Sequence, residues 1–292
     1  MHRENGVRVP APNVRHEPVS FPNNGVRLVG DRRVPDGAAR GTVVFLHGGG
    51  QTRHSWGKAA ERVARSGWTT LSLDARGHGD SAWAPDGRYT LDAFVADLCT
   101  VLDELPEAPV LVGASLGGIT ALSAAGERPG CAAGLVLVDV APRISTAGRA
   151  RIIDFMAGAP DGFASLDQVA DAIHAYNPHR RRPRNLDGLR KNVRQRENGR
   201  WYWHWDPKFL DFGDEPSRNT EADRLAAAAR ALRIPTMLVR GSESDVVTAE
   251  SVEDLRKLVP SARFEEVHAG HMVAGDDNDV FTTHLIDFLA AA

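Results

Sequence analysis

The sequence has little cysteine, no long apolar run and no marked excess of charge of either sign. Its 292 residues include two cysteines, Cys99 and Cys131, each in an Ala/Leu-rich segment. We therefore expect two small buried thiols rather than a disulfide or a metal pair. No apolar run approaches the ~20 residues of a membrane-spanning helix, and the net charge of −3 argues against general nucleic-acid binding. We expect neither a membrane nor a nucleic-acid partner, and a reducing, cytoplasmic setting.

The chain begins with a polar, proline-bearing stretch, "MHRENGVRVPAPNVRHEP". This stretch lacks the apolar core of a secretory signal, so residues 1–16 are predicted to form a flexible tail. The remaining length and an apolar content of 42% are ordinary for a globular protein and allow a sizeable core.

Short apolar runs alternate with helical patterns over most of the chain. A hairpin is predicted first, with a turn at Asn23, Asn24 and Gly25. Such runs, apolar on both faces and separated by helices, predict a mostly parallel sheet with helices on both sides. With the hairpin, the sheet has eight strands. The predicted later strands are 42–47, 68–74, 109–114, 134–140, 235–241 and 262–267, and the helices are 56–66, 90–104, 116–127, 248–258 and 277–290.

One long interval breaks this alternation. A structureless loop over residues 141–233 is improbable inside a compact domain, and the segment contains helical patterns such as "SLDQVADAIHAY" and "EADRLAAAARAL". We therefore predict an inserted helical cap at 141–233, over a core formed by residues 17–140 and 234–292.

The pentapeptide Gly113–Gly117 matches the G-x-S-x-G pattern, directly after a predicted strand and directly before a predicted helix. In that context the pattern is typical of a strained turn that exposes a nucleophilic serine, here Ser115. The flanking glycines let strand and helix approach closely, and the helix N-terminus favours developing negative charge.

A serine hydroxyl needs a histidine base, and the histidine needs an acid to orient it. In this architecture the acid and then the histidine follow the serine in the chain. Asp245 lies just beyond the strand "PTMLVRG", and His271 follows the last strand. Asp139 and Glu243 are alternatives for the acid, and His268 is an alternative for the base. We favour Asp245 and His271.

The glycine-rich stretch "HGGG" after the strand at 42–47 predicts an oxyanion hole, because its backbone amides can face a pocket unhindered. One donor should be the amide of Leu116 and the other that of Gly49, with Gly50 as the alternative. His47 and Trp56 are expected to pack beside this loop and to border the substrate pocket.

Two stretches of the predicted cap bear on substrate choice. The segment "GRWYWHWDPKF" is aromatic, and it could either line an apolar pocket or seal the cap against the core. Residues 180–200 are rich in arginine; they could attract an anionic substrate, but a solvated surface is the favoured interpretation. The aromatic candidates for the pocket are Trp201, Trp203 and Trp205.

These motifs together resemble the α/β-hydrolase fold family over nearly the whole chain. The resemblance rests on "HGGG" with Trp56, "DARGHGDS", "GASLGG", "SESDVV" and "AGHMVAGDDND". The last block looks like that of cap-bearing bacterial hydrolases often labelled epoxide hydrolases or cofactor-free peroxidases. Epoxide hydrolases of this fold use an aspartate nucleophile, whereas this chain has Ser115. The resemblance therefore implies acyl chemistry.

The leading hypothesis is a serine hydrolase that cleaves a carboxylic ester, lactone or thioester through an acyl-enzyme. It would need a small-molecule ester and water, and no metal or other cofactor. The same triad could serve a perhydrolase, a haloperoxidase-like enzyme or a C–C bond hydrolase. A non-catalytic small-molecule receptor is the alternative from another class.

Overall fold

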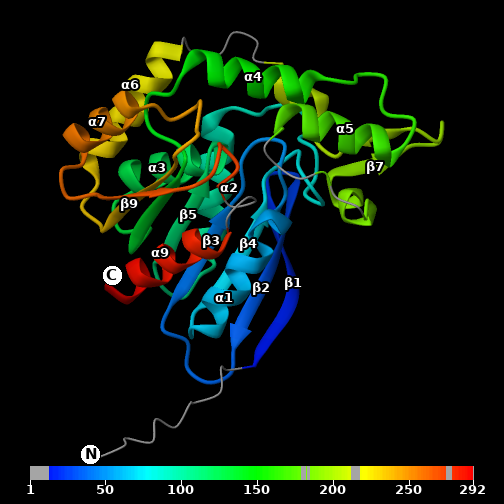
Figure 1. The fold of residues 1–292 in the computed structure, drawn as a ribbon. Coiled ribbons are helices and arrows are strands. Elements are labelled where there is room, and N and C mark those ends of the chain that lie inside the picture. Colours follow the sequence, from blue (N-terminus) through cyan, green and yellow to red (C-terminus); the bar gives the residue numbers. More distant parts are fainter. Residues whose placement is uncertain (1–12, 179–181, 183–184, 212–217, 274–277, 292) are drawn as a thin grey trace, which may run out of the picture.

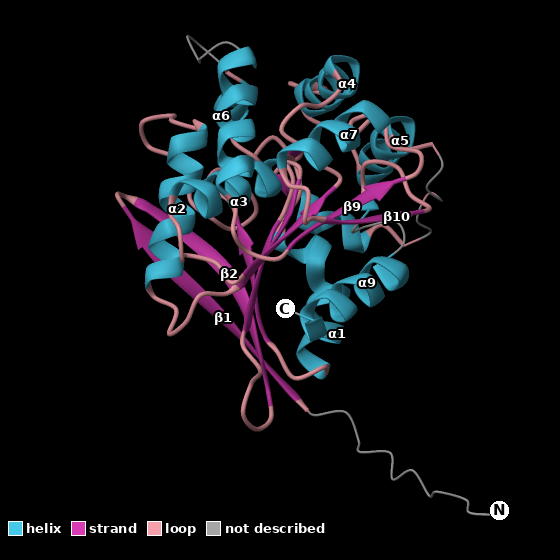
Figure 2. Cartoon of the chain, turned by 90° about the vertical axis from the view of Figure 1, so that its left-hand side faces the viewer, coloured by secondary structure: helices cyan, strands magenta, loops and turns pink. Residues whose placement is uncertain are grey.

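A computed structural model describes residues 13–178, 182, 185–211, 218–273 and 278–291, and its centre is a single eight-stranded sheet (Figures 1 and 2). The strand order is β1-β2-β4-β3-β5-β6-β9-β10. The strands are β1 (Val14–Asn23), β2 (Val26–Pro35), β3 (Thr42–Leu46), β4 (Thr69–Asp74), β5 (Val110–Ala114), β6 (Gly134–Val138), β9 (Thr236–Gly241) and β10 (Arg263–Val267).

The pairing of the strands confirms the predicted mostly parallel sheet. β2 pairs antiparallel with both β1 and β4, and the other neighbours are parallel. The hairpin turn lies at Asn24 and Gly25, whose φ angles are 45° and 83°, as a tight hairpin turn requires. The parallel strands all end at the same edge of the sheet, so the loops that follow them can meet there.

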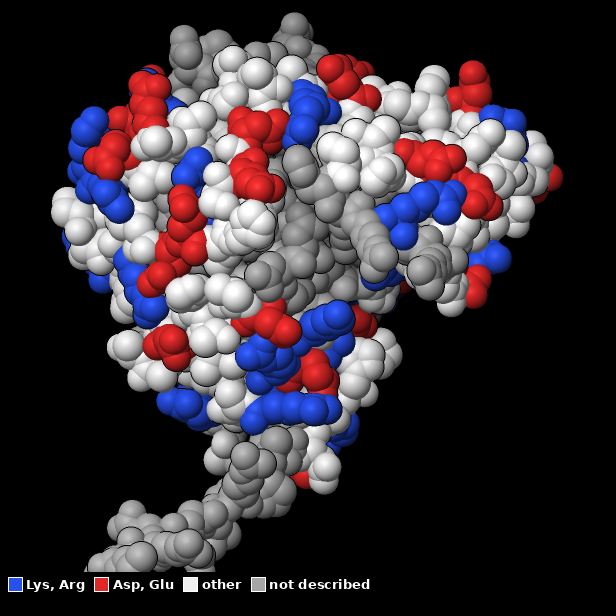
Figure 3. All heavy atoms as spheres, viewed as in Figure 1, with Lys and Arg blue, Asp and Glu red and all other residues white. Residues whose placement is uncertain are grey.

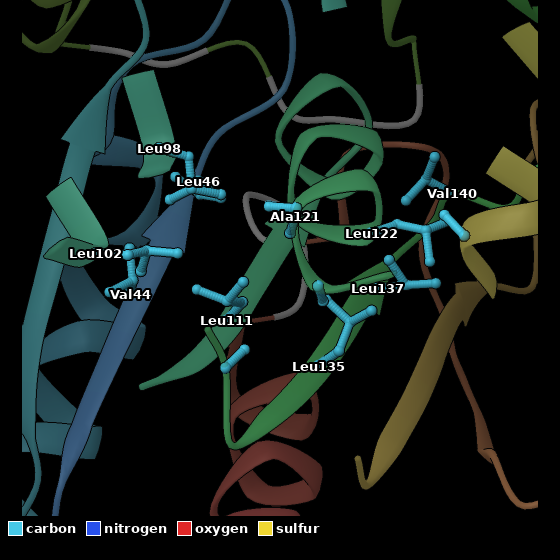
Figure 4. Packing of buried hydrophobic residues seen from close by; sticks show 14 of the residues in the cluster. Val44, Leu46, Leu98, Leu102, Leu111, Ala121, Leu122, Leu135, Leu137 and Val140 are labelled. Atoms are coloured by element: carbon cyan, nitrogen blue, oxygen red, sulfur yellow. The ribbon is translucent and has the colours of Figure 1, made fainter. Parts of the chain in front are cut away.

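Successive side chains of the central strands point alternately into two hydrophobic clusters, one on each face of the sheet. In β3, Val44 and Leu46 face one hydrophobic cluster, whereas Val43 and Phe45 face the other. Leu111 of β5 and Leu135 of β6 share the first cluster, with helix residues such as Leu98, Leu122 and Ala121 (Figure 4). Because both faces are covered, these strands read as continuous apolar runs instead of alternating ones.

Helices cover the two faces in separate groups (Figure 2). One face carries α1 (Gly57–Arg65) and α9 (Asn278–Ala291), and the other carries α2 (Leu91–Asp103), α3 (Leu116–Glu127), α6 (Arg218–Ala231) and α7 (Ala249–Leu258). A 3₁₀ turn, η1 (Arg53–Trp56), leads into α1. The helix limits predicted from the sequence agree with these to within one residue at most ends.

A third group of elements, here called the cap, lies across the edge of the sheet where the parallel strands end (Figure 1). It has its own apolar cluster, which includes Met156, Phe163, Val169, Trp203 and Trp205. The cap comprises α4 (Thr146–Ala157), α5 (Leu166–Tyr176), η2 (Asp187–Asn192), β7 (Val193–Gln195), β8 (Trp201–Trp203) and η3 (Pro207–Leu210).

The predicted cap was too long at its carboxyl end. Helix α6, predicted as a cap helix, packs against α3 of the core, and Leu225, Ala228 and Ala229 belong to the same cluster as the sheet. A Cβ on Gly126 of α3 would lie only 2.4 Å from the carbonyl oxygen of Ala228. The two helices approach this closely because residue 126 has no side chain.

The predicted tail was also too long. Residues 1–12 lie outside the described residues, but Val14, Arg15 and His16 already belong to β1, paired with Pro35, Val34 and Arg33 of β2. The strand extends further than its apolar pattern suggests, because backbone pairing with β2 does not require apolar side chains.

We expect the substitution Gly126→Ala to lower the free energy of unfolding by about 1–3 kcal/mol, because the new methyl group must push α3 and α6 apart. Urea unfolding measures the change. Gly57→Ala is the matched control: no atom lies within 4 Å of a Cβ there and the φ angle is −50°. The control should be neutral or stabilising, and equal stability of both variants would contradict the close packing.

Candidate active site

Ser115 occupies the sharp turn between β5 and α3. Its φ and ψ angles are 47° and −116°, a conformation that non-glycine residues rarely adopt and that costs about 1–3 kcal/mol. A Cβ atom at position 117 would lie only 2.4 Å from the carbonyl oxygen of Leu46. The turn is possible because Gly117 has no Cβ atom. Such strain at a serine between a strand and a helix is typical of a nucleophile.

His271 contacts a carboxylate that is fully buried. Its Nδ1 lies 2.8 Å from Oδ2 of Asp139, and the two side chains are 8% and 0% exposed. The carboxylate also accepts hydrogen bonds from the amide of Gly241 (2.9 Å) and from Oγ of Ser244 (2.5 Å). A carboxylate accepts at this contact, so Nδ1 of His271 carries the proton and Nε2 presents its lone pair.

The prediction that Asp245 holds this histidine is wrong. Asp245 is 40% exposed and pairs with Arg151 at 3.0 Å. The loop after β9 turns so that Ser244 points inward to Asp139, and the next side chain points outward. Asp139 ends β6, the strand beside the serine's own strand β5. Strands that follow each other in the chain are commonly neighbours, and this rule is the signal that could have favoured Asp139.

His268 and Glu243, the remaining candidates for the base and the acid, lie at the surface. His268 is 84% exposed and sits 3.9 Å from Glu243, which is itself 44% exposed. Neither contacts the buried pair. Of the two candidates, His271 is therefore the one that the structure brings to a buried acid, and it lines the same cavity as Ser115. No hydrogen bond joins the side chains of His271 and Ser115 in the structure, and catalytic contacts are often longer before substrate binds.

The glycine-rich loop leaves one amide available. The amide of Gly48 donates to Oε1 of Gln51 and that of Gly50 to Nε2 of His78, both at 3.1 Å. Within the part of the chain that the structure describes, the amides of Gly49 and Leu116 have no acceptor. An oxyanion hole requires two free amides near the serine. Leu116 follows Ser115 in the chain, and Gly49 lines the same cavity with its amide free, which supports the choice of Gly49 over Gly50.

His47 supports the loop and Trp56 packs in the core, but neither borders the cavity, which corrects the prediction for both. Nε2 of His47 accepts from the amide of Ala75 (3.0 Å), so its Nδ1 donates to the carbonyl of Gly48 (2.8 Å). Burial lowers the pKa of His47, which keeps the ring neutral. Trp56 is fully buried under the sheet between Phe45 and Phe281, because the 3₁₀ turn directs it into the core.

The cavity beside the serine has a volume of about 800 Å³ and lies between the core and the cap. Trp203 and Trp205 line it, with their rings stacked 4.8 Å apart. Trp201, predicted as a third pocket residue, does not line it; this side chain lies under the guanidinium of Arg190, and its backbone pairs with Phe163. Trp201 and Trp203 are two residues apart on β8 and share the apolar cluster of the cap, but only Trp203 reaches the cavity. Other apolar residues around the cavity are Ile152, Phe155, Met156, Ile173 and Leu189.

The arginine-rich stretch mostly ties the cap together. Arg182 pairs with Asp167 and Asp171, both at 2.9 Å, and Arg200 donates to the carbonyls of Asp161 and Gly162. Residues 180, 181 and 184 lie outside the described residues. Figure 3 shows basic and acidic side chains interspersed over the face it views. These two arginines therefore hold segments of the cap together, and Arg182 also lines the cavity beside the serine.

The described residues contain no group of three His, Cys, Asp or Glu side chains placed to hold a metal ion. In the same residues, no helix has the length and apolar character needed to cross a membrane. Cys99 and Cys131 are both free thiols of intermediate exposure, less buried than predicted.

Comparison with known proteins gives relatives along most of the chain. The esterase Rv0045c of Mycobacterium tuberculosis is 35% identical over 251 residues, covering 82% of this chain and 80% of the relative. The mouse sn-1-specific diacylglycerol lipase ABHD11 is 31% identical over 276 residues, covering 90% and 83%. Lipase LipV of Mycobacterium tuberculosis is 34% identical, covering 82% and 88%.

The solved structures agree. A crystal structure of the esterase Rv0045c superimposes with a TM-score of 0.72 at 32% identity, covering 98% of this chain and 93% of the other. E-2-(acetamidomethylene)succinate hydrolase superimposes with a TM-score of 0.80 at 19% identity, covering 94% and 100%, which shows the shared fold alone. The family model described as the alpha/beta hydrolase fold matches residues 41–277. The chain thus belongs to the α/β-hydrolase fold family.

Proposed function

We propose that this protein is a serine hydrolase of carboxylic esters with a triad of Ser115, His271 and Asp139. The observation that carries the proposal is the 2.8 Å contact between His271 and a buried carboxylate, beside a cavity that also holds a serine on a strained turn. Relatives named as an esterase and as lipases support ester hydrolysis as the reaction.

The orientation of the histidine sets the first step. Because Nδ1 of His271 is bonded to Asp139, Nε2 is free to accept the proton of the Ser115 hydroxyl as the oxygen attacks the ester carbonyl. The carboxylate accepts from Nδ1 and stabilises the imidazolium. Its hydrogen bonds from Gly241 and Ser244 keep it in place.

The tetrahedral intermediate carries a negative oxygen, which the amides of Gly49 and Leu116 would bind. One such donor is typically worth ~3 kcal/mol of transition-state stabilisation. The imidazolium then protonates the departing alcohol, and Ser115 is left as an acyl ester. The same histidine removes a proton from water as the water attacks the acyl-enzyme. It then returns the proton to the Ser115 oxygen as the ester bond breaks and the acid leaves.

The cavity favours small-molecule esters with an apolar acyl or alcohol group. Aromatic and aliphatic side chains of the cap form much of its wall, and a volume of about 800 Å³ is in the range of small-molecule sites. Hydrolysis of such an ester needs only water as a second reactant.

Free thiols at Cys99 and Cys131 are consistent with the cytoplasm, which we propose as the location.

The substitution Ser115→Ala should abolish hydrolysis of p-nitrophenyl butyrate and labelling by a fluorophosphonate probe, while thermal unfolding still shows a folded protein. Labelling is read by intact mass, with the unsubstituted protein as the positive control. Wild-type turnover by the variant would show that another group is the nucleophile. A folded, unsubstituted protein that the probe does not label would favour the non-catalytic receptor.

The substitution Asp139→Asn should lower kcat by about 10⁴-fold, because an amide favours the wrong tautomer of His271. Asp245→Asn is the matched control, since it removes the same charge from a side chain that faces Arg151 at the surface. The control should retain kcat within ~3-fold, since it loses only a surface ion pair. Steady-state kinetics distinguish the two, and the reverse ranking would return the acid to position 245.

A further inference from the structure

Three buried imidazoles lie in a row behind the glycine-rich loop, and the proposed chemistry uses none of them. His47 follows β3, His78 lies in the loop after β4, and His204 comes from the cap directly after β8. Their ring centroids are 5.3 Å and 5.8 Å apart in that order. Each ring is at most 2% exposed, and none borders the cavity beside the serine.

Like His47, the imidazoles of His78 and His204 each accept a hydrogen bond from a backbone amide. Nε2 of His78 accepts from Gly50, while its Nδ1 donates to the carbonyl of Arg76 at 3.0 Å. Nδ1 of His204 accepts from the amide of Gly79 at 2.8 Å. A backbone amide can only donate, so both rings must be neutral at these contacts. Burial lowers the pKa of His78 to about 3 and that of His204 well below 6.5.

Residues of the cap hold the loop that carries His78 in place through several hydrogen bonds. Besides the His204 contact, the amide of Asp206 donates to the carbonyl of Gly77 at 2.9 Å. Arg194 donates to the carbonyl of Gly79 at 2.9 Å and to the Asp80 carboxylate at 2.8 Å. Residues 77–80 are therefore held from the cap side through both backbone and side-chain groups.

The same loop holds the oxyanion loop from behind. Because His78 accepts from the amide of Gly50, that amide is not available to an oxyanion, whereas the neighbouring amide of Gly49 has no acceptor among the described residues. Phe209 of the cap packs edge-on against the His78 ring, with centroids 4.8 Å apart. A Cβ on Gly49 would lie 3.6 Å from the Phe209 ring, so the same cap residue also covers the oxyanion loop.

We infer that His78 and His204 are positioning residues through which the docked cap sets the geometry of the oxyanion hole. His204 holds residues 77–80 through its hydrogen bond to Gly79, and His78 in turn holds Gly50 through the hydrogen bond from the Gly50 amide. The neighbouring Gly49 amide is thereby kept in position for the oxyanion. The inference rests on the proposed function. It makes the cap a part of the catalytic apparatus as well as a wall of the pocket.

Amide side chains test this with paired variants. The oxygen of asparagine can replace Nδ1 of histidine, and that of glutamine can replace Nε2, which lies further from the backbone. His78→Gln and His204→Asn therefore keep the acceptor, whereas His78→Asn and His204→Gln misplace it. All four remove the ring. The acceptor-keeping residue is the longer one at position 78 and the shorter one at position 204, so side-chain size alone cannot give the expected ranking at both positions.

The variants that misplace the acceptor, His78→Asn and His204→Gln, should lose ~10-fold or more in kcat for p-nitrophenyl butyrate. Their KM should stay within ~2-fold, because the lost interaction belongs to the transition state. The variants that keep the acceptor, His78→Gln and His204→Asn, should retain kcat within ~3-fold of the unsubstituted enzyme. Equal kcat within each pair, whether both are lowered or both retained, would overturn the inference. Thermal unfolding of each variant checks that folded enzymes are compared.

Arg194→Ala keeps the experiment decisive if the buried variants do not fold. This half-buried side chain grips Gly79 and Asp80 from the cap, and its loss should lower kcat several-fold at unchanged KM. Tyr202→Phe on the same cap hairpin, which loses only a contact from Asn198, is the control and should match the unsubstituted enzyme. Equal kcat for Arg194→Ala and the control would overturn the inference. Ser115→Ala separates this outcome from failure of the proposed function, since retained turnover there refutes the triad itself.

Discussion

A buried carboxylate at the end of β6 holds together the parts of this site. Asp139 receives hydrogen bonds from His271, from the Gly241 amide and from Ser244, so two segments far from it in the sequence converge on it. A carboxylate without exposure is costly unless such donors surround it. The same bonds that allow its burial fix the tautomer of His271. The hydrogen bonds that orient the histidine base are therefore the same ones that hold the loops together at the ends of the strands.

The sheet explains why this arrangement can form beside Ser115. Parallel strands β5 and β6 are neighbours, and each is followed directly by a residue with positive φ, 47° at Ser115 and 49° at Asp139. Both backbone conformations are unfavourable on their own. Two apolar cores, one on each face of the sheet, provide the burial that offsets them. The strained residues stand at the edge where the cap closes the cavity.

The cap and the core meet through polar contacts as well as apolar ones. Trp203 and Trp205 turn toward the cavity, while His204, the residue between them, turns toward the core loop at 77–80. This alternation along one short segment gives the cap two roles. One face contributes to substrate binding, and the other holds the loop behind the oxyanion hole.

Local patterns in the sequence were sufficient for the elements and for several site residues. Strand and helix limits, the turn at Ser115 and the available amides at Gly49 and Leu116 depend on periodicity and on glycines close in the chain. The acid, the packing of α6 on α3 and the row of imidazoles were decided by the tertiary structure. Asp139 and Asp245 both follow a strand at the same edge, and only the direction of the loop after β9 separates them. His204 differs from its aromatic neighbours in its partner, which lies 125 residues away in the chain and is brought near by folding alone.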